Sequence, residues 1–175
     1  MNRLAPPLLI LLGGLVLVRH GAAQAPGASV SADAVVVTVG IAMASLRDLA
    51  FGTVPKGVAT PVLPTAANAG AWQITGNANA FVSIAFTLPT QLTNIQALPG
   101  STMPIAFSAT SAIWRRANNN PAGGNVFNPA TGATGRFGPP GNPTLYIWIG
   151  GTVNPALTAK PGIYRGAIIV SLTYL

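Results

Sequence analysis

The side chains that could carry acid–base or metal chemistry are few in this chain of 175 residues. It has two acidic residues, Asp33 and Asp48, a single histidine, His20, and no cysteine. General acid–base catalysis, hydrolysis by paired carboxylates and most metal sites need these groups. Thiol nucleophiles, disulfides and zinc fingers need cysteine. We therefore expect a protein that is not an enzyme and that binds no metal or cofactor.

Lysine is the remaining candidate for nucleophilic chemistry. A Ser/Lys or Thr nucleophile assisted by Lys56 or Lys160 is compatible with the composition. Both lysines, however, stand in turn sequences, Pro55-Lys56-Gly57 and Lys160-Pro161-Gly162. The chain has no Walker-type Gly-Lys-Ser/Thr run and no Gly-x-Ser-x-Gly elbow. An enzyme is thus the weakest of three functional hypotheses.

The basic residues are scattered along the chain. Nine Lys and Arg against two acidic residues give a formal net charge of +7. Only Arg115 and Arg116 are adjacent, and no Lys/Arg-rich run occurs, which is unlike a nucleic-acid-binding domain. We expect solvated surface charges and no nucleic-acid partner.

Residues 1–25 have the pattern of an export signal. Arg3 gives a positive start, residues 8–18 are mostly apolar, and small residues follow, with cleavage sites after Ala23 or Ala25. The alternative, an uncleaved membrane anchor, is disfavoured because a bilayer span needs roughly 20 apolar residues. The sequence predicts passage through the periplasm to the cell surface or medium. The mature form is expected to have no membrane span.

The rest of the chain alternates between apolar and polar residues. Stretches 82–88, 145–149 and 168–174 place apolar side chains at every second position, and Pro and Gly separate these runs. Short strands with turn signals between them indicate an all-β domain over residues 35–175, a β-sandwich. In the last stretch the side chains that share one face are Ile168, Val170, Leu172 and Tyr174.

Residues 117–143 depart from this pattern. Asn, Gly and Pro make up 17 of the 27 residues, so the segment has little apolar surface to bury. We expect a long loop, held down by Phe127 and Phe137. Two interpretations stay open, a functional loop and a tolerated surface insertion.

Two short motifs near the ends of this domain have a structural interpretation of their own. In Leu49-Ala50-Phe51-Gly52 the aromatic ring can anchor the core before a turn or bulge at the glycine. In Gly162-Ile163-Tyr164-Arg165-Gly166 the glycines permit backbone angles that strain other residues. Tyr164 can then point its ring inward and its hydroxyl at a backbone group.

Together with the ending Val170-Ser171-Leu172-Thr173-Tyr174, these motifs resemble a bacterial family of exported, pilin-like β domains of unknown function. That family is similar to spore-coat-protein-U-type and chaperone–usher fimbrial subunits. The motif positions that carry the resemblance are Leu49, Phe51, Gly52, Gly162, Tyr164 and Gly166.

The resemblance implies an immunoglobulin-like (pilin-type) β-sandwich that is incomplete and complemented by a donor strand. In such subunits the N-terminal extension of the next subunit supplies this strand by β-strand addition. Here the extension is residues 26–34, which carry Val30, Ala32 and Ala34 at alternate positions. Two alternatives stay open: the segment is the first strand of a self-complete sandwich, or it is a disordered tail.

The resemblance also gives the C-terminal strand, Ile168 to Tyr174, a docking role toward a periplasmic assembly chaperone and usher. It implies an exported structural subunit of a cell-surface filament, fimbria or coat, self-assembling into a homopolymer.

The second hypothesis is a monomeric, secreted or cell-surface binding module, for example for glycans. Aromatic rings can stack on sugars, and Tyr146 and Trp148 share one face of an expected strand. Core packing is the commoner role of such rings. The candidate stacking residues are Trp72, Trp114, Tyr146 and Trp148.

Overall fold

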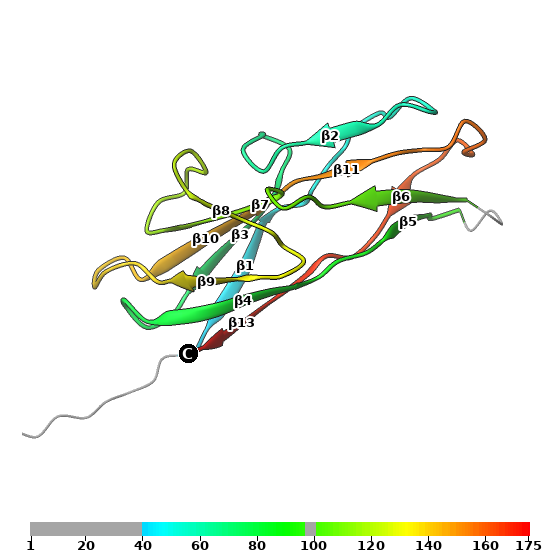
Figure 1. The fold of residues 1–175 in the computed structure, drawn as a ribbon. Helices are drawn as coiled ribbons and strands as arrows, with labels where there is room; N and C mark the ends of the chain where they lie inside the picture. The colour runs from blue at the N-terminus through cyan, green and yellow to red at the C-terminus, as the bar shows by residue number, and fades with distance from the viewer. Residues whose placement is uncertain (1–39, 97–100) are drawn as a thin grey trace, which may run out of the picture. The chain divides into compact units, whose positions relative to one another are not determined.

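The computed structural model describes residues 40–96 and 101–175, which belong to one unit, Val37–Leu175. This part is all-β, as predicted, and contains no helix (Figure 1). In particular, no helix that could cross a membrane is found within these two ranges. The strands are β1 (Ala42–Arg47), β2 (Thr60–Val62), β3 (Gly70–Thr75), β4 (Phe81–Thr87), β5 (Gln91–Asn94), β6 (Thr102–Ala106), β7 (Ala112–Arg116), β8 (Asn125–Phe127), β9 (Ala133–Arg136), β10 (Thr144–Ile149), β11 (Gly151–Val153), β12 (Tyr164–Arg165) and β13 (Ile169–Tyr174).

The strands form three antiparallel sheets. One has the order β1-β3-β10-β7-β8, the second β13-β4-β9 and the third β12-β5-β6-β11-β2. The third sheet continues the other two, because β11 follows β10 after Gly150 alone, and β5 and β12 continue the β4–β13 pair. This arrangement is consistent with a β-sandwich.

The two layers are joined on one side only. Strand β6 pairs with β11 on one edge and with β5 on the other, so it links the layers. On the opposite side β1 pairs only with β3, and β13 only with β4, among the described residues. Gly150 allows the β10–β11 junction, since a Cβ there would lie 2.2 Å from the Val62 carbonyl oxygen.

The predicted apolar faces lie in the core. Val82 and Ile84 are buried, as are Leu145, Ile147 and Ile149, which confirms the alternation of stretches 82–88 and 145–149. The first core cluster contains Ile74, Val82, Ile84, Phe137, Leu145, Ile147 and Val170. The second contains Leu92, Met103, Ile105 and Val153.

Residues 117–143 differ from the long loop expected. They contain the short strands β8 and β9, which pair with β7 and β4. Backbone pairing lets these edge strands form without much apolar burial, so a segment poor in apolar residues can still contain strands. Phe137 anchors the segment, as predicted, and is fully buried. The Arg115 guanidinium also donates to the carbonyls of Asn120 and Ala122.

Candidate functional site, a groove beside two edge strands

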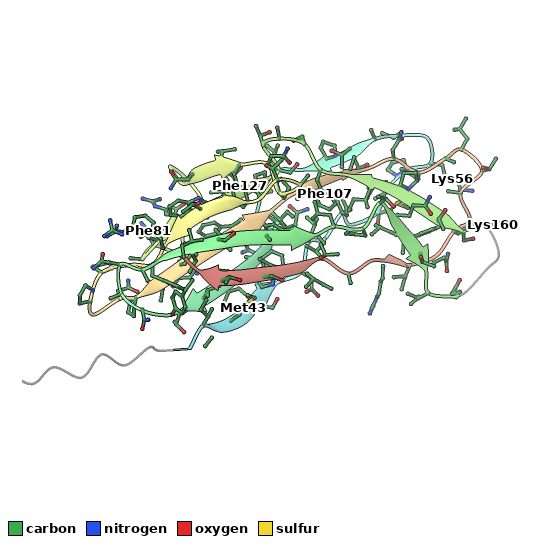
Figure 2. The ribbon with its side chains drawn as sticks, turned by 60° about the horizontal axis from the view of Figure 1, so that its bottom comes forward. Met43, Lys56, Phe81, Phe107, Phe127 and Lys160 are labelled. Carbon is green, nitrogen blue, oxygen red and sulfur yellow. The ribbon has the colours of Figure 1, made fainter. Side chains whose placement is uncertain are left out.

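The inner face of β1 is left uncovered. Met43 lies opposite Ile74 in the ladder, so its side chain is on the core side of the sheet. Ile74 is fully buried, whereas 41% of the Met43 surface is exposed. Figure 2 shows Met43 on β1, beside β13. An apolar side chain on the core face of an edge strand is thus accessible to solvent.

A groove of about 950 Å³ opens on this side of the domain. One rim is the chain that follows β1, residues 47–54, and the other is residues 159–168, which lead into β13. Its volume lies within the usual ligand-pocket range of roughly 300–1,000 Å³. The floor is apolar and consists of Trp72, Leu92, Met103, Ile105 and Val153.

The two sequence motifs face each other across this groove. All six motif residues line it, although the motifs lie at opposite ends of the domain sequence. Their residue types indicate a structural role. The sequence does not show that they line one groove, because this depends on contacts between distant parts of the chain. On the first rim are Leu49, Phe51 and Gly52, and on the second Gly162, Tyr164 and Gly166.

The first rim is fixed from its outer side. The Ala50 amide donates to the Asn68 carbonyl at 3.0 Å, and the Asn68 side-chain amide donates back to the Ala50 carbonyl at 2.6 Å. Phe51 packs against the second core cluster, and Gly52 has a φ of 68°. The predicted aromatic anchor followed by a turn is confirmed. The rim keeps its position without a strand bound beside it.

The second rim is fixed by Tyr164. Its hydroxyl donates to the Lys160 carbonyl at 2.7 Å, which confirms the predicted bond to the backbone. Gly162 adopts a φ of 144°, as its glycine predicts, and a Cβ there would lie 2.4 Å from Asn94 Nδ2. Gly166 has no such positive φ. Its glycine is explained instead by close packing, because a Cβ would lie 2.7 Å from Leu92 Cδ2.

The C-terminal strand alternates as predicted. Val170 is buried, Leu172 and Tyr174 pack against the first core cluster, and Ile168 lines the groove. The Tyr174 hydroxyl accepts a hydrogen bond of 2.8 Å from the Asn77 amide. The docking role of these four residues stays a prediction.

The rims of the groove are rich in positive charge. Asp48 is the single acidic residue that lines it. Lys56 and Lys160 lie at the same end (Figure 2), and a hydrogen bond of 2.8 Å from the Gly57 amide to the Pro155 carbonyl holds their loops together. The basic lining residues, all exposed, are Arg47, Lys56, Lys160 and Arg165.

The candidate stacking residues are largely core residues. Trp72 makes an edge contact with Phe86 at a centroid distance of 6.0 Å, and Trp114 packs against the first core cluster. Tyr146 stacks on Trp148, but only 1% of the Trp148 surface is exposed. These rings therefore form no open aromatic platform.

Other predicted features fall elsewhere. The signal segment 1–25 and the donor segment 26–34, with Val30, Ala32 and Ala34, lie outside the described residues. In residues 40–96 and 101–175 no group of three or more His, Cys, Asp or Glu side chains could hold a metal ion.

No family model matches the sequence, and neither does any curated protein.

Proposed function

We propose that this protein is an exported structural subunit of a cell-surface filament, fimbria or coat, which assembles by β-strand addition. Its domain is an immunoglobulin-like, pilin-type sandwich that a strand from another copy completes. The observation that carries this proposal is the apolar groove whose two rims continue β1 and lead into β13, strands that each pair with a single neighbour in the described part of the chain.

The groove is suited to a strand. Its floor includes Val153, which is fully buried, and Met103 and Ile105, which are 8% and 7% exposed. An inserted strand would pack alternate side chains over the part of this floor that is still exposed and pair its backbone with a rim of the groove. Free edges promote uncontrolled association, so a specific strand partner also removes an aggregation hazard.

The occupant that fits is segment 26–34 of a second copy. It has nine residues and would extend over roughly 30 Å as a strand. The rim that leads into β13, residues 159–168, has nearly the same number of residues. Val30, Ala32 and Ala34 would then point to the floor, while Ser31 and Asp33 point to solvent.

A second copy is favoured over the chain's own segment by the connecting sequence. Between residue 34 and the first described residue, Gly40, the chain reads Val35-Val36-Val37-Thr38-Val39. Tight turns need Gly, Asn, Asp or Pro, and β-branched residues resist the required backbone angles. A hairpin that returns segment 26–34 to its own groove is therefore disfavoured.

An assembly chaperone belongs to the same proposal. Before a second copy arrives, the groove and the chain that leads into β13 would be open in the periplasm. A chaperone strand that pairs with Ile168, Val170, Leu172 and Tyr174 would cover them in transit.

The test compares two faces of the donor segment in the mature exported protein. Val30→Asp with Ala32→Asp puts carboxylates on the groove face, and the control Ser31→Asp puts one on the opposite face. Negative-stain microscopy and SDS-resistant ladders should show filaments for the wild type and the control only. Filaments from the double variant, or from a protein that lacks residues 24–34, would contradict the proposal. A wild type that stays monomeric at high concentration would also contradict it.

A further inference from the structure

The groove concentrates the positive charge of the domain. Residues 40–96 and 101–175 contain seven Lys and Arg, four of which line the groove. The only acidic residue among the described residues, Asp48, also lies there. The second acidic residue of the whole chain is Asp33, in the proposed donor segment. The charged side chains of the donor segment and most of those of the groove therefore have opposite signs.

The domain has two distinguishable ends. Ala42, at the start of β1, pairs with Thr75, and nearby Asn77 binds the hydroxyl of Tyr174 at the end of β13. The start of β1 and the end of β13 thus share one end of the domain. Lys56 and Lys160 lie at the other end of the domain, where the second rim of the groove begins (Figure 2).

The pairing direction places Asp33 near these lysines. A strand that pairs antiparallel with residues 160–168, the more stable arrangement, has its C-terminal end at Lys160. Asp33 is one residue from the end of segment 26–34. It faces away from the floor when Ala32 and Ala34 face toward it, and the solvent side is where the exposed Lys56 and Lys160 lie.

We propose that Asp33 of the incoming copy pairs with Lys56 and Lys160 and thereby sets the register and direction of the donor strand. This inference rests on the proposed function. It identifies the partner as a second copy of this chain, whose extension carries a single acidic residue at the required position.

The apolar fit alone fixes the register poorly. Ala32 and Ala34 are small, so a slip of two residues would still present small apolar side chains to the floor. Such a slip moves Asp33 by roughly 7 Å, beyond contact with the same lysines. A slip of one residue would turn Asp33 toward the apolar floor. In both shifted registers the ion pair between Asp33 and the two lysines is lost, so the correct register is favoured.

The test measures the assembly rate of the purified mature protein after dissociation, at several NaCl concentrations. Asp33→Asn should slow assembly about two- to fivefold at low salt and flatten its salt dependence, as expected for an exposed ion pair. The matched control is Arg116→Gln, which removes a charge that does not line the groove. It should assemble at the wild-type rate with an unchanged salt dependence.

A charge exchange completes the test. Lys56→Glu with Lys160→Glu should slow assembly, and adding Asp33→Lys to the same chain should restore it. Circular dichroism verifies that each variant is folded. Equal rates for Asp33→Asn and the wild type at all salt concentrations, or no rescue by the exchange, would overturn this inference but leave strand addition standing. No assembly of the wild type under any condition would overturn both proposals.

Discussion

At the scale of single residues, the side chain of Tyr164 links the second rim to the turn at Lys160, where this rim begins. Its hydroxyl bond to the Lys160 carbonyl is intramolecular and fixes the rim before any strand is bound. The first rim is fixed in a comparable way through Asn68. A groove with rims already in place can bind a strand at a lower entropic cost than one that must order its rims on binding.

Tyr164→Phe should lower the free energy of unfolding by about 0.5–1.5 kcal/mol, because one hydrogen bond is lost while the ring stays. Urea unfolding of the mature protein, followed by fluorescence, measures the change. Tyr146→Phe is the control, since Tyr146 stacks on Trp148 through its ring. An equal effect in both variants would show that the Lys160 bond contributes nothing.

The glycines of the two motifs should differ in their response to alanine. Gly52 has a φ of 68° and open space around its Cβ position, so Gly52→Ala should cost about 1–2 kcal/mol from backbone strain. Gly162→Ala adds a collision with Asn94 Nδ2 at 2.4 Å and should cost more. Thermal unfolding of both variants tests this order, and a milder effect at Gly162 would contradict it.

At the scale of elements, sequence patterning identified three of the strands that are covered on their inner side. The stretches 82–88, 145–149 and 168–174 correspond to β4, β10 and β13, because a covered face requires apolar residues at every second position. All six residues of β1 are exposed. Its inner face therefore does not need apolar residues at every second position, and the sequence of β1 shows no such alternation. Both the missing alternation in β1 and the opening on this side of the domain follow from the same fact: no described strand covers the inner face of β1.

The floor of the groove could not be identified from the sequence. Met103 and Ile105 alternate as in any core strand, and only the pairing of β6 with both β5 and β11 places them under the opening. The motif residues Phe51 and Tyr164 were found, because Gly-rich turns beside aromatic rings are recognisable locally. That they share one groove depends on contacts between distant parts of the chain.

Truncating an isoleucine should have different effects in the closed core, at Ile147, and in the floor of the groove, at Ile105. Ile147 is fully buried in the first core cluster, and Ile147→Ala should cost about 2–5 kcal/mol. Ile105 lines the open groove, so Ile105→Ala should cost less in the dissociated subunit, because fewer neighbouring atoms are lost. In assembled material its cost should rise, since the bound strand then packs on Ile105. Urea unfolding of dissociated and assembled protein tests this, and an unchanged Ile105 cost would argue against strand insertion.

At the scale of the whole molecule, the proposed strand addition would join the copies head to tail. The chain enters β1 at Ala42, at the end of the domain that β1 shares with Tyr174. A donor strand that is antiparallel to β13 leaves the acceptor groove at the Lys56 and Lys160 end. Each copy would thus use different surfaces as donor and acceptor. Such a contact does not close on itself and produces an open filament.

The same asymmetry predicts that a donor peptide stabilises an empty subunit. A protein that lacks residues 24–34 has an acceptor groove but no donor, so it should remain a monomer. A synthetic peptide of residues 24–39, at 100 times its dissociation constant, should add about 2.7 kcal/mol to the free energy of unfolding by mass action. For a domain of this size, that corresponds to a rise of roughly 5–11 °C in the unfolding temperature.

The control is the peptide with Val30→Asp and Ala32→Asp, which should cause no shift in the unfolding temperature. Its carboxylates would face the apolar floor formed by Met103, Ile105 and Val153. Equal stabilisation by both peptides would show that binding does not use the groove.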